Sequence, residues 1–317
     1  MAEVLVTGAF GYIGGRVARH LSALGHTLRL GTRRAGVQPP EWIRNGEVFT
    51  CNVFDDGQLE AACDGVDCVV HLASVNENVC AADPALALNV NGIGTLRTLL
   101  SAIQAGVGRF IYLSTAHVYG APLTGIITEA TLPKPLHPYA ISHRTAEDFV
   151  LAAQAKGDID GIVLRLSNGF GAAECADVDR WTLLVNDLCR QAVTTGRMIM
   201  RSPGNDERDF VTLEDTARAV AHFVGLDRMA LGNGLFNVGS GRSIQVHEMV
   251  ELIAQRCETM LGLRAAIVRP DSQGSAPASL DYRIDKLRAT GFMSAGNMQG
   301  EIDATLKLCQ TAFGVSV

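Results

Sequence analysis

The sequence predicts an α/β protein with a doubly wound parallel sheet and a smaller C-terminal lobe. Through the first two-thirds of the chain, short aliphatic or β-branched runs alternate with helical patterns, as in successive βαβ units. Several of these runs are apolar throughout, which is typical of strands covered by helices on both faces. A glycine-rich turn from Gly8 to Gly14 directly follows the first run and opens a helical pattern.

The elements follow from these patterns in order. We expect strands at residues 4–7, 27–30, 48–51, 68–72, 109–113, 161–166 and 234–238. Helical spacing covers residues 14–24, 84–105, 139–156, 181–195, 212–225, 246–261 and 300–313. A polar loop at 201–209 and a Pro/Gly/Ser-rich stretch at 269–278 interrupt the later pattern. The predicted lobes interleave: residues 1–168 and about 209–243 form the sheet domain, and about 169–208 and 244–317 form the smaller lobe.

Charge and composition exclude several classes of protein. The net charge is −6 and no basic block is longer than Arg33-Arg34, so nucleic acid is not an expected partner. No apolar run is long enough to cross a membrane, and no signal peptide is evident. The eight cysteines are scattered, which indicates reduced thiols in a cytoplasmic protein and no metal site.

The glycine turn predicts a dinucleotide-binding site. Gly8, Gly11 and Gly14 lie between a strand and a helix, where a side chain at Gly11 would collide with a bound pyrophosphate. The start of the helix offers free N–H groups and a positive potential to the phosphates.

The end of the second predicted strand favours NADP over NAD. NAD-preferring sites place an acidic residue here to bind the ribose 2′-hydroxyl, whereas this chain has Thr32 followed by Arg33 and Arg34. An arginine at this point can pair with a 2′-phosphate. The same arginines could instead lie in a solvated loop, so NAD stays possible.

Nine motifs in order resemble the extended short-chain dehydrogenase/reductases, specifically the nucleotide-sugar epimerase/dehydratase branch. The resemblance runs nearly end to end, and its motifs are Thr7–Gly14 (TGAFGYIG), Asn52-Val53, His71–Ser74 (HLAS), Asn91–Thr95 (NGIGT), Leu113–Gly120 (LSTAHVYG), Tyr139–His143 (YAISH), Arg165–Gly171 (RLSNGFG), Arg208–Asp215 (RDFVTLED) and Phe236–Gly241 (FNVGSG). The resemblance implies a Rossmann core of about seven strands, a C-terminal substrate-binding lobe and a homodimer formed by helices 84–105 and 139–156.

It also implies roles for individual residues. The expected cofactor-binding residues are Gly8, Phe10, Gly11, Tyr12, Ile13, Gly14, Thr32, Arg33, Asn52, Val53, Leu72, Ala73, Ser74, Asn91, Tyr139 and His143. The expected substrate-binding residues are Ser74, Val75, Asn76, Thr115, Asn168, Arg208 and Arg269. Arginines suit this role because their guanidinium groups pair with a diphosphate.

Tyr139, Thr115 and His143 are the expected catalytic residues. The resemblance makes Tyr139 the acid/base at the sugar and Thr115 the hydroxyl that hydrogen-bonds the same oxygen. A free tyrosine with a pKa near ~10 is a poor base at neutral pH, so the family places a lysine four residues later on the same helical face. Here that position is His143.

Three roles are open for His143. It can substitute for the lysine by donating a hydrogen bond to the nicotinamide ribose, although an imidazole with a pKa of ~6.5 is mostly neutral at pH 7. Another cation can fill the role, or catalysis can have been lost. Ala116-His117 stands where the family's 4,6-dehydratases carry Asp-Glu, which disfavours dehydration.

The sequence therefore predicts an NAD(P)-dependent oxidoreductase that moves a hydride at C4 of a nucleotide-activated sugar, as a 4-epimerase or a 4-ketoreductase. Two alternatives stay open. One is a reductase or dehydrogenase of a small carbonyl or hydroxyl compound without a nucleotide. The other is a catalytically weak NADP-binding sensor.

Overall fold

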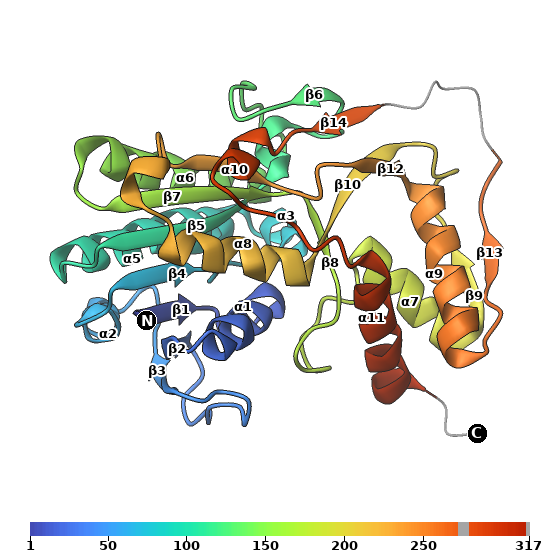
Figure 1. Cartoon of the computed structure of the whole chain (residues 1–317), viewed down its shortest axis with the longest axis horizontal. Coiled ribbons are helices and arrows are strands. Elements are labelled where there is room, and N and C mark those ends of the chain that lie inside the picture. The colour runs from blue at the N-terminus through green and yellow to red at the C-terminus, as the bar shows by residue number, and fades with distance from the viewer. Residues whose placement is uncertain (272–278, 315–317) are drawn as a thin grey trace.

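The computed structural model describes residues 1–271 and 279–314, and it confirms the predicted fold class. Its main sheet has seven parallel strands in the order β11-β7-β5-β4-β1-β2-β3 (Figure 1). These strands are β1 (Glu3–Thr7), β2 (Thr27–Thr32), β3 (Gly46–Thr50), β4 (Cys68–His71), β5 (Arg109–Thr115), β7 (Asp160–Leu166) and β11 (Leu235–Val238). Each corresponds to a predicted strand, with small differences at the ends.

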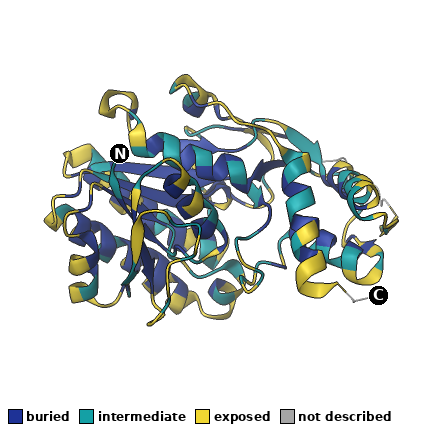
Figure 2. Ribbon diagram, turned by 60° about the horizontal axis from the view of Figure 1, so that its bottom comes forward, coloured by how far each residue is buried: buried dark blue, intermediate teal, exposed yellow. Residues whose placement is uncertain are grey.

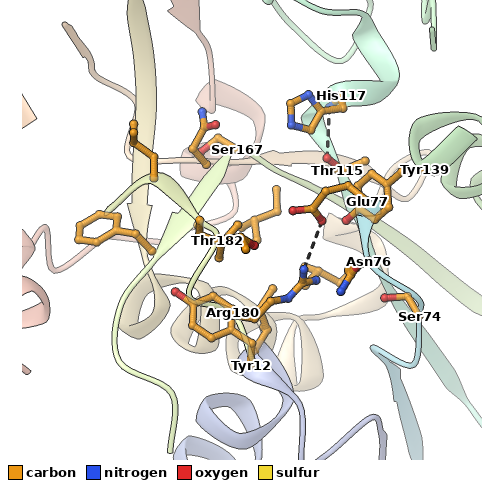
Figure 3. Close-up of a pocket in the computed structure, with 18 of the residues that line it drawn as sticks. Tyr12, Ser74, Asn76, Glu77, Thr115, His117, Tyr139, Ser167, Arg180 and Thr182 are labelled. Atoms are coloured by element: carbon orange, nitrogen blue, oxygen red, sulfur yellow. Dashed lines mark hydrogen bonds and ion pairs between the residues drawn. The ribbon is translucent and has the colours of Figure 1, made fainter. Parts of the chain in front are cut away.

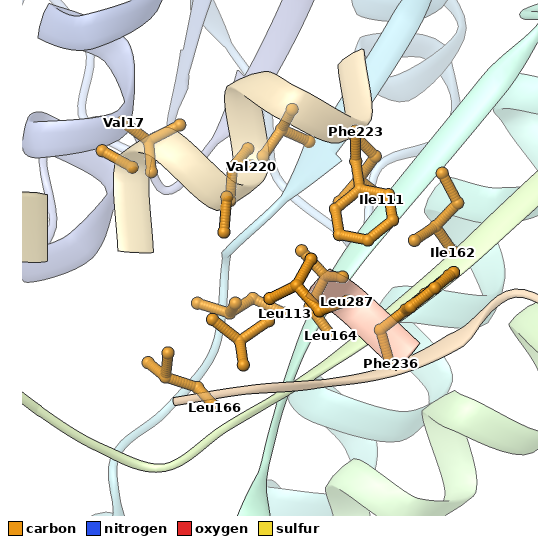
Figure 4. Packing of buried hydrophobic residues seen from close by; sticks show 14 of the residues in the cluster. Val17, Ile111, Leu113, Ile162, Leu164, Leu166, Val220, Phe223, Phe236 and Leu287 are labelled. Carbon is orange, nitrogen blue, oxygen red and sulfur yellow. The ribbon is translucent and has the colours of Figure 1, made fainter. Parts of the chain in front are cut away.

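Helices cover both faces of this sheet, which explains why several of its strands are largely apolar. On one face, α1 (Tyr12–Ala23) and α8 (Leu213–Gly225) pack against each other. Their side chains Val17, Val220 and Phe223 share a buried cluster with residues of the strands (Figure 4). The other face carries α2 (Asp56–Cys63), α5 (Gly94–Gln104) and α6 (Pro138–Lys156), which enclose a second cluster. Figure 2 shows buried residues concentrated along the sheet and the inner sides of these helices.

The predicted helix 84–105 is divided into three parts. It consists of α4 (Pro84–Ala87), a π-helical turn at Leu88–Ile93 (η1) and α5. The π-helical turn contains Asn91, a buried residue whose amide holds a loop beside the site. π-Helical turns often occur at functional sites, and the hydrophobic period alone does not reveal them. The short helices α2 and α3 (Glu77–Ala82) were not predicted, because neither is long enough to show a clear period.

The C-terminal lobe is a helical cluster with small sheets. Three helices, α7 (Leu184–Thr195), α9 (Val246–Leu261) and α11 (Met298–Phe313), pack together around a third buried cluster. Short strands complete it: β8 (Asn168–Phe170), β10 (Glu207–Thr212), β12 (Ser243–Gln245), β9 (Arg197–Ile199) and β13 (Ala266–Val268). α7 begins three residues later than predicted, because Trp181 is buried in this cluster from the loop before the helix.

Other short elements lie at the edge of the sheet domain. They are η2 (Ala116–Tyr119), β6 (Gly125–Ile127), η3 (Arg228–Ala230), β14 (Leu280–Tyr282) and α10 (Asp285–Ala289). Leu280, Tyr282 and Leu287 belong to the buried cluster of the sheet. Most of the Pro/Gly/Ser-rich stretch 269–278 lies outside the described residues. The exact division of the chain into two lobes stays a prediction.

A buried ion pair fixes α6 to the sheet. Glu147 on α6 accepts two hydrogen bonds from Arg165 on β7, at 2.9 Å from Nε and 2.6 Å from Nη2. Ser114 on β5 donates a third bond to the same carboxylate at 2.6 Å. The Arg165 guanidinium also lies over the ring of Tyr119, 4.6 Å from its centroid. Both charged side chains are almost fully buried, so Arg165 depends on Glu147 for its charge compensation.

We expect Glu147→Leu to lower the free energy of unfolding by about 3–5 kcal/mol, because it leaves the Arg165 charge buried and unpaired. The double variant Glu147→Leu/Arg165→Met should recover much of that loss, since neither charge remains. Asp148→Asn is the matched control: it removes an exposed α6 pair with Arg144 and should cost under about 1 kcal/mol. Urea unfolding of the wild type, these three variants and Arg165→Met alone measures these free energies. If the loss in the double variant equalled the sum of the losses from Glu147→Leu and Arg165→Met made singly, the pairing would be contradicted.

Candidate active site

A cavity of about 820 Å³ opens at the carboxyl ends of the parallel strands, where ligands of such sheets bind. Both lobes contribute to its walls (Figure 3). It brings together most of the residues that the sequence singled out. They are Gly8, Gly11, Tyr12, Ile13, Gly14, Arg33, Leu72, Ser74, Val75, Asn76, Thr115, Tyr139, His143, Asn168 and Arg208.

The glycine turn is built for close backbone approach. Gly8 has a φ of +66°, and a Cβ there would stand 3.0 Å from the backbone of Leu72 and Ala73. Thr7 fixes the same junction, because its hydroxyl accepts hydrogen bonds from the N–H groups of Leu72 and Ala73 at 3.1 and 3.2 Å. The ends of β1 and β4 are thereby held side by side at the floor of the cavity.

The start of α1 fits a dinucleotide phosphate. The N-cap of α1 is Gly11, which has no side chain to cap the first turn, and the first turn has no acidic residue. A Cβ on Gly14 would lie 2.0 Å from the Gly8 carbonyl oxygen, so only glycine permits this tight entry into the helix. The first N–H groups of α1 are therefore available to an anion at the cavity wall.

Two arginines follow β2, and one of them lines the cavity. Arg33 lines it, while the Arg34 guanidinium lies over the Phe10 ring at 5.6 Å. Thr32 accepts a hydrogen bond from the Arg34 N–H at 3.2 Å. An acidic side chain is absent from this strand end, as the sequence shows.

Several of the expected cofactor-binding residues do not line the cavity. Phe10, Thr32, Asn52, Val53, Ala73 and Asn91 are outside the lining found among the described residues. Val53 is buried against Gly94, and Asn52 caps the turn that precedes α2 through the Phe54 N–H. Asn91 supports the wall: its amide bonds the N–H of Val75 at 2.8 Å and the Ser142 hydroxyl at 3.1 Å. The contact of these six residues with a bound cofactor stays a prediction.

Tyr139 and Thr115 face the cavity from α6 and from the end of β5. Tyr139 is half-buried, and burial is the main cause that raises the pKa of its hydroxyl, to about 12. The Thr115 hydroxyl accepts a hydrogen bond from the backbone N–H of His117 at 3.2 Å. Its own proton therefore stays available to a ligand oxygen.

His143 is buried and cannot provide a positive charge. Its Nδ1 lies 2.5 Å from the Tyr112 hydroxyl, and its ring packs edge-on against the Tyr139 ring with centroids 4.4 Å apart. Burial lowers its pKa to about 3, and nearby His71 and His117 act in the same direction. The imidazole is therefore neutral at pH 7. Its Nε2 is buried and has no hydrogen-bond partner among the described residues.

Asn168 and Arg208, which the sequence predicts at the substrate, both line the cavity. The Asn168 amide donates to the Asp209 carbonyl at 2.9 Å, which joins β8 to β10. Asp209 itself is buried and accepts hydrogen bonds from Ser240 and Gly241, so its role is to hold the loop after β11. Arg269 is exposed beyond β13 and lies outside the cavity lining among the described residues. Its position gives no support to the expected substrate contact.

Sequence reasoning missed five charged residues in the lining of this cavity, Glu77, Asp179, Arg180, Asp206 and Glu207, and two of them form an ion pair. Glu77, in the first turn of α3, and Arg180, in the loop before α7, both line it. They form an ion pair with Nη1 and Oε2 3.2 Å apart (Figure 3). The Asn76 N-cap followed by an acidic residue is a helix-start signal that could have placed Glu77 after β4. No local pattern marks Arg180, because its loop has no regular period.

The comparisons with known proteins agree with this architecture. Residues 4–239 match the NAD dependent epimerase/dehydratase family. The chain belongs to this family. UDP-glucose 4-epimerase of Azospirillum brasilense is 28% identical over 308 residues, which cover 90% of this chain and 85% of the relative.

Two solved structures show the same fold. UDP-glucose 4-epimerase of Thermotoga maritima with UDP-glucose has a TM-score of 0.81 at 22% identity, covering 98% of this chain and 99% of the other. RMD of Pseudomonas aeruginosa with NADPH has a TM-score of 0.77 at 22% identity, with coverage of 98% and 99%. The predicted resemblance is thus confirmed, and this epimerase/dehydratase family member is an enzyme with a nicotinamide cofactor.

Two structural features are absent from the part of the chain that the structure describes. None of the helices in this part is long and apolar enough to span a membrane. The His, Cys, Asp and Glu side chains in this part form no group of three or more that could hold a metal ion.

We expect the His143 imidazole of this family member to stay neutral from pH 8 to pH 5, because burial lowers its pKa to about 3 from 6.5. The unfolded chain takes up a proton near pH 6.5. The contribution of His143 therefore reduces stability as the pH falls from about 6.5 toward 3, by up to about 1.4 kcal/mol per pH unit. Nitrogen-15 NMR of the ring, assigned with His143→Gln, measures the titration. A midpoint near 6.5 in the folded protein would overturn this account.

Proposed function

We propose that the enzyme transfers a hydride at C4 of a nucleotide-activated sugar, with NADP(H) as its preferred cofactor, as a 4-epimerase or a 4-ketoreductase. The observation that supports this most is the convergence of three features on one cavity. These are the glycine turn at the start of α1, the paired hydroxyls of Thr115 and Tyr139, and Asn168 with Arg208 from the second lobe. The similarity to nucleotide-sugar 4-epimerases supports the same proposal.

In this proposal a bound nicotinamide accepts or returns the hydride. Tyr139 exchanges a proton with the sugar C4 oxygen, because its hydroxyl lies at the cavity wall without a hydrogen-bond partner among the described residues. Thr115 donates a hydrogen bond to the same oxygen, since the His117 N–H already occupies one of its acceptor sites. Removing a proton from the C4 hydroxyl requires the Tyr139 phenolate, so oxidation of the alcohol should speed up as the pH rises.

His143 takes a neutral role in this proposal. Its Nε2 has no partner among the described residues and belongs to a side chain at the cavity wall, so a ribose hydroxyl of the cofactor can satisfy it. The Tyr112 hydroxyl holds the other ring nitrogen and fixes the plane of the ring. His143 thus replaces the hydrogen bond of the family's lysine and leaves its charge unreplaced.

The groups beside Thr115 favour hydride transfer without dehydration. Ala116 and His117 occupy the positions that would hold an acid/base carboxylate pair. His117 lines the cavity, and burial lowers its pKa, so it is not a permanent charge there. Arg208 and Asn168 then bind the diphosphate of the nucleotide, since a guanidinium can bind a phosphate through paired hydrogen bonds.

The central experiment incubates the enzyme with UDP- and dTDP-hexoses and their 4-keto forms, with either cofactor. Deuterium from labelled NADPH should appear at C4, or the C4 epimer should form, as NMR of the sugar can detect. Tyr139→Phe should lower the rate about 10²–10⁴-fold, because it removes the acid/base. Tyr119→Phe is the control, since Tyr119 binds Asn237 in the core. Turnover of small carbonyl compounds alone, or none at all despite NADP binding, would count against the nucleotide-sugar proposal.

The NADP preference rests on Arg33. We expect Arg33→Ala to weaken NADP⁺ binding about 10–100-fold, because hydrogen bonds to charged groups contribute about 1.5–3 kcal/mol, and to leave NAD⁺ binding nearly unchanged. Arg34→Ala is the comparison, since Arg34 lies on Phe10. Calorimetric titration with both cofactors measures the affinities. Equal losses for NAD⁺ and NADP⁺ would argue against recognition of a 2′-phosphate.

We also propose the homodimer through the helical region 84–105 and α6. Leu99, Val150 and Ala153 are buried in the sheet cluster. Other apolar side chains of these helices stay exposed, namely Leu88, Ile93, Leu100, Ile141 and Phe149. A second copy of the chain would cover them. Sedimentation equilibrium that shows only monomer at micromolar concentration would contradict this.

A further inference from the structure

The strongest unexplained feature of the cavity is the pair formed by Arg180 and Glu77. The Arg180 side chain is 23% exposed and the Glu77 side chain 40%, so the pair lies at the cavity wall and is only partly shielded from water. Glu77 projects from α3 of the sheet domain, and Arg180 comes from the loop between β8 and α7. In Figure 3 the two side chains meet below Tyr139 and Thr115.

Arg180 is held in place by more than Glu77. Its carbonyl oxygen accepts a hydrogen bond from the Asn186 amide at 3.3 Å, and the same amide donates to the Tyr12 hydroxyl at 3.0 Å. Tyr12 is the first residue of α1, directly after the glycine turn. The position of Arg180 is therefore linked to the part of the fold that would receive the cofactor.

The site needs a positive charge near Tyr139 that His143 does not supply. Three permanent cations line the cavity among the described residues: Arg33, Arg180 and Arg208. Arg33 follows β2, and the charge of Arg208 acts on His117. Arg144, on α6, is bound to Asp148 and Glu147 instead. Of the three, Arg180 is the one bonded to α3, the helix that packs against α6 and so lies beside the element that carries Tyr139. Its charge also lowers the pKa of Tyr139.

We propose that Arg180 is a positioning residue for Tyr139: held by Glu77, it provides the fixed positive charge that favours the phenolate and that His143 lacks. This inference rests on the proposed acid/base role of Tyr139. In this family a lysine has two roles, which are divided here between two residues. His143 makes the hydrogen bond to the cofactor, and Arg180 provides the positive charge.

The charges around Tyr139 set the expected signs. Burial raises the pKa of Tyr139 to about 12, and among its neighbours Arg180 lowers it while Glu77 and Cys80, both on α3, raise it. The other titratable groups near it are His143 on α6, which is neutral, and Tyr112 on β5, whose pKa burial raises well above its usual value. His117, on η2, has a pKa that burial lowers. Arg180 and Glu77 therefore act on Tyr139 in opposite directions.

The test uses four variants of the full chain: Arg180→Gln, Arg180→Lys, Glu77→Gln and Arg208→Gln. Arg208→Gln is the matched control, because it removes an arginine from the same cavity that does not act on Tyr139. The first measurement is a titration of Tyr139 in protein labelled with carbon-13 at tyrosine Cζ, with NADP⁺ bound and no sugar. Tyr139→Phe assigns the signal among the five tyrosines.

We expect Arg180→Gln to raise the Tyr139 pKa by at least about half a unit and Glu77→Gln to lower it, since an adjacent opposite charge favours the ionised form. Arg180→Lys should stay near the wild type, and Arg208→Gln should leave the titration unchanged. An equal rise in Arg208→Gln, or shifts of the same sign in Arg180→Gln and Glu77→Gln, would overturn the proposal.

The second measurement is the pH dependence of hydride transfer from a substrate alcohol. Below the pKa of Tyr139, the logarithm of the rate rises with pH. A change in that pKa therefore shifts the plot of this logarithm against pH along the pH axis. Arg180→Gln should lower the rate and Glu77→Gln should raise it at the same pH. A merely structural pair would lower the rate in both variants. If the titrations behave as expected but no nucleotide sugar reacts, the substrate proposal fails and the role of Arg180 stands.

Discussion

The site depends on one buried interaction, the pairing of Glu147 with Arg165 and Ser114. Tyr139, His143 and Glu147 follow one another at intervals of four on α6, so they share one helical face. Glu147 bonds β7 and β5 at the deep end of this face, which sets the rotation of the helix about its axis. A helix rotated by one residue would turn Tyr139 away from Thr115. Tyr139 and Thr115 therefore line the same cavity because an almost fully buried charge pair two turns away holds the helix in place.

The burial that fixes α6 also decides the electrostatics of the site. His143 lies on the inner face of the helix, between the Tyr112 hydroxyl and the Tyr139 ring, and loses its charge through desolvation. The same desolvation raises the pKa of Tyr139 and so opposes the phenolate. A permanent cation is needed to act against it, and an arginine keeps its charge under conditions in which an imidazole does not. This is why the charge is assigned to Arg180, which its ion pair with Glu77 holds at the cavity wall.

Sequence reasoning was most successful where chemistry is local. The turn from Gly8 to Gly14 was predicted from the spacing of its glycines between a strand and a helix, and the structure shows the tight contact that requires glycine there. The seven strands were found because each is a short apolar run between turn signals. The sequence did not reveal how supporting residues are bonded: Asn91, expected at the cofactor, bonds Val75 and Ser142, and its contact with a cofactor stays a prediction. Arg269 was expected at the substrate and is exposed outside the cavity lining of the described chain.

The sequence by itself determined the fold, the family and the presence of a tyrosine with a histidine four residues later, because periodicity and motif spacing are properties of neighbours along the chain. Only the tertiary structure decided the charge state of that histidine, since desolvation depends on what surrounds the ring in space. The tertiary structure likewise brought Arg180 to Glu77 across 103 residues of chain. Contacts of this kind arise from the packing of two lobes, and no local pattern records them.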